Sequence, residues 1–132
     1  MKERSQSLVR RSAVLTGAES GLKRAVCDYK RHKMVKKWRR ERTAAIRAYL
    51  GAHAVRRLHL GAGGNLLPGW LNSDVSPLNS NVSYLDATDP FPFGDCTFDY
   101  VFCEHFIEHI SYDKGQSALR ECYRVLRPEG LA

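Results

Sequence analysis

The sequence has no long apolar run, and this absence sets the first limits on its class. No segment of the 132 residues approaches the roughly 20 consecutive apolar residues of a membrane-spanning helix. The N-terminal residues carry basic side chains without a continuous apolar stretch, which argues against a signal peptide. We therefore expect a cytoplasmic protein without a membrane span.

Closely spaced cysteines are also missing. The four cysteines, Cys27, Cys96, Cys103 and Cys122, lie far apart, and no two have the C-x2-C spacing of a zinc or redox site. The composition is not that of a secreted disulfide scaffold either. We interpret these residues as reduced structural thiols and expect no metal.

Acidic residues are scarce in the first part of the chain. Residues 1–57 hold 17 Lys or Arg and 4 Asp or Glu, whereas residues 58–132 hold 4 basic and 10 acidic residues. The whole basic excess of the chain, a net charge of +7, therefore lies in the first part. Such asymmetry indicates a functional division. We predict a basic, mostly helical extension over residues 1–54 and a domain over residues 55–132.

Proline is absent between Leu22 and Leu50, and apolar residues recur there at helical steps. The pattern predicts one long basic helix or two shorter ones, with Gly51 as the stop. Tyr29 and Trp38 fall on the apolar stripe, so we expect both to pack. Nucleic acid, anionic lipid and an acidic protein are alternative partners for the basic face. A solvated face on a helix beside the ligand site is the preferred interpretation.

Beyond residue 54 the pattern changes to short strands separated by Pro and Gly turns. The predicted strands are residues 55–60, 70–75, 82–85 and 98–103, and a helix is predicted over residues 114–126. The strands end in Gly, Asp, Asp and Glu-His. Because ligands of open α/β sheets bind at the carboxyl ends of the strands, we expect Asp74, Asp86 and Glu104 on one rim.

Two of these strand ends carry the first chemical signals. Gly61-x-Gly63 follows a strand directly, which permits a tight turn and close approach of the backbone to a ligand. Asp74 ends the next strand, where a carboxylate can accept two hydrogen bonds from a ribose diol. A plain structural turn at the glycines, and a turn aspartate before Ser76-Pro77, remain the alternatives.

The ordered combination of motifs resembles a known family. LHLGAGGNLLPGWLNSDV, then YLDATDPFPFGDCTFDYVFCEHFIEHI, then ALRECYRVLRPEG is similar to the type 11 group of class I S-adenosylmethionine-dependent methyltransferases. The similarity is strongest to bacterial members and covers Leu58 to Gly130. It implies an α/β fold with a partial Rossmann-like methyltransferase sheet of four strands, preceded by the basic helical extension.

The resemblance also implies roles for individual residues. Gly61, Ala62 and Gly63 would line the methionine part of S-adenosylmethionine, and Asp74 would bind the ribose hydroxyls. Asp86 and the backbone of Ala87 would lie against the adenine edge. Glu104 and His105 would face the methyl donor and the acceptor, with His105 as base where the acceptor needs deprotonation. Asp99 is expected to have a structural role.

The chain departs from the family pattern in three places. The connections after the first and second strands are too short for the usual helices, which must be short or absent. Glu129 stands where the family usually has glycine. The chain also ends two residues after Gly130, so we expect a fragment with strand order 3-2-1-4 and the fourth strand as an unpaired edge.

Other functions compete with methyl transfer. His105-x-x-Glu108-His109 matches an inverted zinc-protease pattern, which requires a continuous helix. His109 is an alternative base, although a non-catalytic role is favoured for it over His105. The chain could also be a non-catalytic binding module, retaining cofactor affinity or acting through its basic helix. For the enzyme, the resemblance implies a small-molecule or saccharide acceptor.

Overall fold

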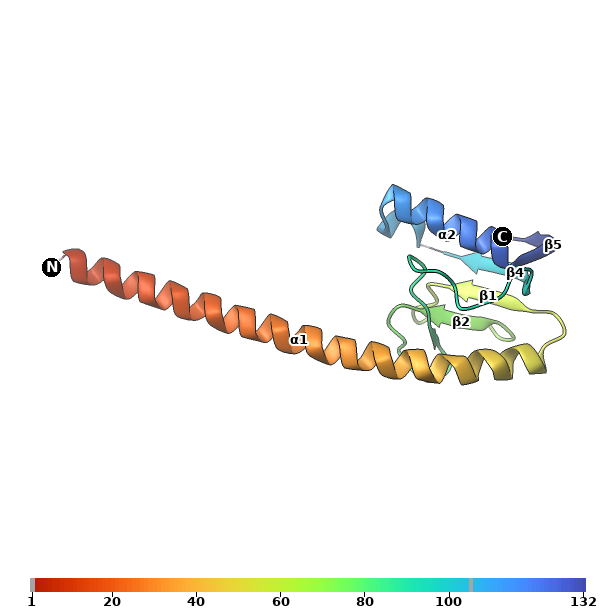
Figure 1. Cartoon of the computed structure of the whole chain (residues 1–132), viewed down its shortest axis with the longest axis horizontal. Coiled ribbons are helices and arrows are strands. Elements are labelled where there is room, and N and C mark those ends of the chain that lie inside the picture. Colours follow the sequence, from red (N-terminus) through yellow and green to blue (C-terminus); the bar gives the residue numbers. More distant parts are fainter. Residues whose placement is uncertain (1, 105) are drawn as a thin grey trace. The chain divides into compact units, whose positions relative to one another are not determined.

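The computed structural model describes residues 2–104 and 106–132, with side chains from residue 20 onward. The elements in chain order are α1 (Lys2–Ala52), β1 (Arg57–Leu60), β2 (Leu71–Asp74), β3 (Ser83–Tyr84), β4 (Phe98–Cys103), the 3-10 turn η1 (Ile107–His109), α2 (Tyr112–Val125) and β5 (Leu126–Leu131) (Figure 1). Contacts divide the chain into two compact units, Met1–Lys37 and Trp38–Ala132. In these described ranges, no helix combines the length and apolarity needed to cross a bilayer.

Helix α1 is a single helix that runs through Gly51 to Ala52. From Trp38 onward one side of it is shielded at helical steps, and Tyr49 is buried. Trp38 stacks on Tyr84 of β3 with ring centroids 5.8 Å apart, which confirms that it packs. The same prediction is wrong for Tyr29, whose residue surface is 69% exposed.

The sheet is fully parallel with strand order β3-β2-β1-β4-β5. The predicted order 3-2-1-4 is confirmed for the first four strands. The prediction of four strands with β4 as an unpaired edge is wrong, because β5 pairs with β4 on its outer side. Leu58 of β1 lies between Leu71 of β2 and Val101 of β4, so the centre of the sheet is apolar.

Strand β5 was missed because its sequence, LRPEGL, has the composition of a turn. Its pairing with β4 is irregular between Phe98 and Tyr100, and Glu129 has a positive φ of 69°. A local irregularity accommodates a proline and a left-handed residue that a regular ladder would not. Arg127 adds an ion pair with Asp99 of β4 at 2.8 Å.

Asp99 has the structural role expected of it. Its Oδ2 accepts a hydrogen bond from the backbone N–H of Arg56 at 2.7 Å, and its Oδ1 accepts one from Arg127. The Arg56 N–H, followed by Arg127, lowers the pKa of this carboxyl. Asp99 thus ties the residue before β1 and a residue of β5 to β4.

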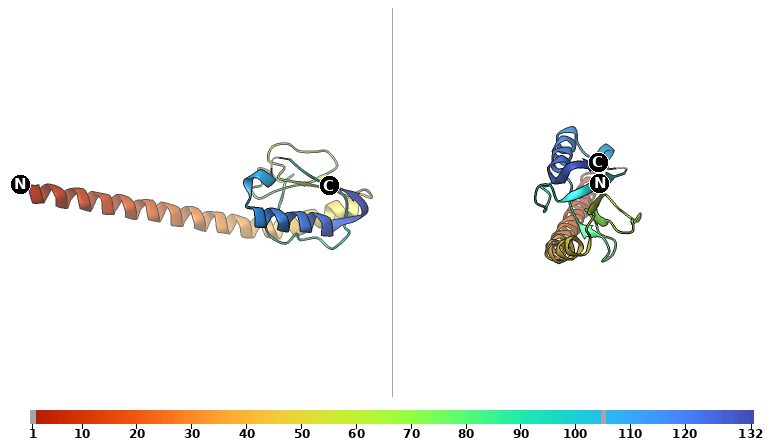
Figure 2. Two further views of the ribbon diagram at one scale, coloured as in Figure 1. Left: turned by 90° about the horizontal axis from the view of Figure 1, so that it is seen from above. Right: turned by 90° about the vertical axis from the view of Figure 1, so that its right-hand side faces the viewer.

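Helix α2 and the last turns of α1 lie on one side of the sheet (Figure 2). The buried cluster they share with the sheet includes Tyr49, Leu58, Phe98, Cys122 and Val125. Phe98 and Val125 are fully buried. This layer is the apolar core of the unit that begins at Trp38.

The opposite side of the sheet has no helix between β1 and β2 or between β2 and β3, as the short connections predicted. The side chain of Asn72 holds the first connection instead. Its Oδ1 accepts hydrogen bonds from the N–H of Leu67 and from Nδ1 of His59, both at 2.9 Å, and its Nδ2 donates to Leu67 O at 3.1 Å. Since Oδ1 only accepts, this arrangement requires the Nδ1–H form of His59. His59 is buried beneath this connection and the ring of Phe102, 5.3 Å away.

Two side chains of α2 hold the loop between β3 and β4. Arg124 donates to both carboxylate oxygens of Glu121, at 2.8 and 2.7 Å, and to the carbonyl of Phe93 at 2.8 Å. Glu121 in turn accepts from the N–H of Phe91 at 2.7 Å. Arg124, and then the Phe91 N–H, lower the pKa of Glu121 against the opposing effect of burial.

We expect Asn72→Ala to lower the free energy of unfolding by about 2–3 kcal/mol, because the buried ring of His59 and the half-buried backbone of Leu67 lose their hydrogen bonds. Urea unfolding followed by circular dichroism measures the loss. Asn81→Ala is the matched control, since Asn81 is exposed and should leave stability unchanged. Equal stability of the two variants would contradict the role given to Asn72.

Glu121→Gln should make stability less dependent on pH. The folded pKa of Glu121 lies below its ordinary value of 4.5, so its contribution is present above that pH and is lost as the pH falls through the folded pKa. At pH 7 the variant should be less stable by about 1 kcal/mol, the scale of a hydrogen bond to a charged group at a partly exposed site. Thermal unfolding between pH 2 and pH 7 should show the two melting curves converging in acid. A difference that stays constant with pH would contradict this.

Candidate functional site

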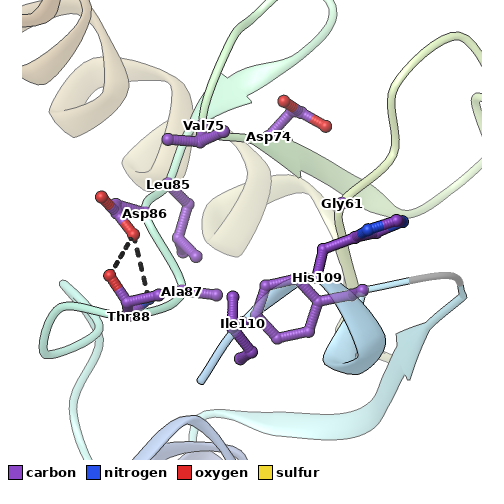
Figure 3. A pocket seen from close by; sticks show the side chains of 10 residues that line it. Gly61, Asp74, Val75, Leu85, Asp86, Ala87, Thr88, His109 and Ile110 are labelled. Atoms are coloured by element: carbon purple, nitrogen blue, oxygen red, sulfur yellow. Dashed lines mark hydrogen bonds between the residues drawn. The ribbon is translucent and has the colours of Figure 1, made fainter. Parts of the chain in front are cut away.

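A cavity of about 420 Å³ opens where β1, β2 and β3 end. It is lined by Gly61, Asp74, Val75, Leu85, Asp86, Ala87, Thr88, Phe106, His109 and Ile110 (Figure 3). Four of the predicted site residues, Gly61, Asp74, Asp86 and Ala87, are therefore brought together. Apolar and acidic groups share the lining, as suits a ligand with an apolar ring and polar hydroxyls.

The glycine loop leaves β1 in a conformation that side chains disfavour. Gly61 and Gly63 have positive φ values of 67° and 49°. A Cβ atom on Gly61 would meet Cβ of Phe106 at 3.6 Å, an ordinary contact, so the backbone conformation rather than crowding requires glycine. Ala62 is buried, and its N–H donates to the carbonyl of Ser73 at 2.9 Å.

Asp74 connects this loop to the end of β2. Its Oδ2 accepts from the N–H of Gly63 at 3.0 Å, and its Oδ1 accepts from the N–H of Ser76 at 2.8 Å. The turn role considered for Asp74 is therefore present. Each carboxylate oxygen keeps a second acceptor position. The half-buried carboxylate can thus hold the turn and accept hydrogen bonds from a ligand diol.

Asp86 follows β3 and has one oxygen engaged locally. Its Oδ1 accepts from the N–H of Thr88 at 3.0 Å and from the Thr88 hydroxyl at 2.7 Å (Figure 3). These bonds fix the carboxylate beside Ala87 on the cavity wall. The second oxygen, Oδ2, accepts no hydrogen bond from the described residues, which leaves an acceptor on the wall.

Of the two catalytic residues predicted at the end of β4, only Glu104 lies within the described residues. Glu104 follows Cys103, is exposed and does not belong to the described lining of the cavity. His105 lies outside the described residues. His109, given a lesser role from sequence, lines the cavity together with Phe106 and Ile110. The second Glu-His pair, Glu108-His109, was the sequence signal that could have identified it.

The zinc interpretation lacks the helix that it requires. Ile107–His109 form a single 3-10 turn, and α2 begins only at Tyr112. The two histidines of this pattern are four residues apart, a spacing that places them on one face only in a continuous α-helix. Within the described residues no group of three His, Cys, Asp or Glu side chains could hold a metal ion.

Two thiols, Cys103 at the end of β4 and Cys122 in α2, are suppressed as nucleophiles. Partial desolvation of this exposed residue, and to a lesser extent the charge of Glu108, raises the pKa of Cys103. Burial and the neighbouring Cys103 raise the pKa of Cys122 to about 12. A thiol acts as a nucleophile only as its thiolate, so Cys122 is inert at neutral pH, in line with the structural role expected of it.

The chain is similar to one protein family and to a solved structure. The family model described as Methyltransferase domain, of the type 11 group, matches residues 58–132. A chain of the solved complex between the Haloferax volcanii Trm112 methyltransferase activator and a methyltransferase is 22% identical, with a TM-score of 0.44 over 64% of this chain. The match spans 48% of that chain, about half its length. No curated protein sequence gives a significant match.

The matched family region begins in β1, contains the glycine loop, both strand-end aspartates and α2, and reaches the end of β5. It covers more than half of the 132 residues, and it coincides with the sheet whose carboxyl ends form the cavity. The chain belongs to the type 11 group of class I S-adenosylmethionine-dependent methyltransferases.

Proposed function

We propose that this chain binds S-adenosylmethionine in the cavity at the ends of β1, β2 and β3, and takes part in methyl transfer in the cytoplasm. The observation that carries the proposal is the pair of aspartates at two neighbouring strand ends, with the Asp74 carboxylate bonded to the glycine loop at Gly63. Family membership and a cavity with both acidic and apolar groups support it.

The cavity residues fit the parts of this cofactor. Asp74 would accept hydrogen bonds from the two ribose hydroxyls, because each of its oxygens keeps an acceptor position. Asp86 Oδ2 and the backbone of Ala87 would bind the adenine edge, with Leu85 and Ile110 as apolar walls. Gly61 and Gly63 would let the backbone approach the methionine part.

The chemical step requires the protein mainly to align the acceptor with the methyl group. S-adenosylmethionine supplies an activated methyl group on a sulfonium, so the protein's main task is to hold the acceptor in line with that methyl. Glu104 and His105 are the proposed residues at the acceptor side. His105 would accept a proton from an acceptor that loses one on methylation. Resemblance to bacterial members favours a small-molecule or saccharide acceptor.

Asp74→Ala should weaken binding of S-adenosylmethionine and of its demethylated product about 100-fold, because two charge-assisted hydrogen bonds to the ribose are lost. Isothermal titration calorimetry measures both affinities. Asp74→Asn should lie between, since its amide oxygen still accepts from Gly63. Asp28→Ala, an exposed aspartate in α1, is the matched control and should bind as the unmodified chain does.

Thermal unfolding of each variant separates loss of binding from loss of fold. Asp74→Ala that melts like the control but binds the product with unchanged affinity would overturn the cofactor assignment. Binding without transfer of a labelled methyl group to any small-molecule or saccharide fraction would favour the non-catalytic binding module instead.

A further inference from the structure

The segment of α1 from residue 20 to residue 37, here called the basic segment, contributes no residue to the described lining of the cavity. It holds seven Lys or Arg and a single acidic residue, Asp28. Its residues 20–34 are all exposed. The net charge of the segment is therefore +6, which gives it a strong positive potential.

Apolar side chains of the basic segment are exposed as well. Leu22 is 68% exposed, Val26 45% and Tyr29 69%. Steps of four and three residues place these three on one side of the helix. Lys30 and Lys33 continue the same steps from Val26, so cations and an exposed aromatic ring share that side.

The presence of apolar and basic side chains on the same side of the helix favours a nucleic acid over an anionic membrane as the partner. A helix that lies in an anionic membrane needs its apolar residues on one face and its basic residues on another. Here Lys30 and Lys33 follow Leu22, Val26 and Tyr29 on the same side, and Arg24 and Arg31 lie on a different side of the helix. Cations beside an exposed aromatic ring suit a nucleic acid, whose phosphates pair with Lys and Arg and whose bases can stack on Tyr.

We propose that the basic segment binds the phosphate backbone of a nucleic acid, independently of methyl transfer. The 18 residues span about 27 Å of helix. A DNA duplex presents one phosphate per ~1.7 Å of its axis, so roughly 16 phosphates lie along that length and several can pair with the segment. The binding is electrostatic and does not depend on nucleotide sequence.

The test uses the full chain with a labelled 20-base-pair DNA duplex and a 20-nucleotide RNA, followed by fluorescence anisotropy from 50 to 200 mM salt. Five phosphate contacts on the duplex give a slope of log K against log salt of about −4.5, and a loss of affinity on the order of several hundred-fold over that range. Changing Lys30, Lys33 and Lys36 together to Gln should weaken duplex binding on the order of 100-fold at 100 mM salt and flatten the slope by about 2.7.

The matched control changes the same three lysines to Arg, which keeps the charge and should keep the affinity. Gln and Arg have helix propensities similar to that of Lys, so circular dichroism should show equal helix content. A slope shallower than about −2 for the unmodified chain overturns the proposal whether or not the variants fold. Equal affinity of the Gln and Arg variants also overturns it. So does binding to phosphatidylserine vesicles with no binding to either oligonucleotide.

Discussion

The connection between β1 and β2 is held by three consecutive side chains of β2, and the position of the cavity depends on them. Asn72 binds the loop at Leu67 and the buried ring of His59. The Ser73 hydroxyl donates to the carbonyl of His59 at 2.7 Å. Asp74 accepts from Gly63 at the turn itself. These bonds hold the helix-free connection at the end of β1 (His59), at the glycine turn (Gly63) and in its middle (Leu67).

This arrangement explains how so short a connection can carry a binding site. In a parallel crossover, the helix normally covers the sheet and sets the angle at which the chain leaves the first strand. Here hydrogen bonds to the side chains of β2 set the angle at which the chain leaves β1. Loop residues, with the rings of Trp70 and Phe102 6.1 Å apart, cover part of the sheet. Phe102 remains 38% exposed, so coverage of this side is incomplete. The apolar core is accordingly concentrated on the other side, beneath α2 and the end of α1.

The sequence predicted elements well where one local signal dominated. Short strand-like segments between Pro and Gly turns located β1, β2, β3 and β4. The glycine loop and the strand-end aspartates located three cavity residues, Gly61, Asp74 and Asp86, and the family resemblance added Ala87. The sequence failed where distant contacts decide. The LRPEGL segment has the residues of a turn and becomes β5 only because β4 offers a free edge and Asp99 binds Arg127. Tyr29 continues an apolar pattern that packs only from Trp38 onward, and nothing in the local pattern marks that change.

The uneven distribution of charge links the two proposals. Residues 58–132 carry an excess of six acidic residues, and Asp74 and Asp86 in the cavity belong to it. That charge suits a cofactor with a cationic sulfonium, but it repels a polyanion at short range. A protein that needs both interactions has to separate them along the chain, because cations placed among the cavity carboxylates would pair with them. In this chain the cations of the basic segment belong to residues 20–37, and the cavity carboxylates belong to residues 58–132.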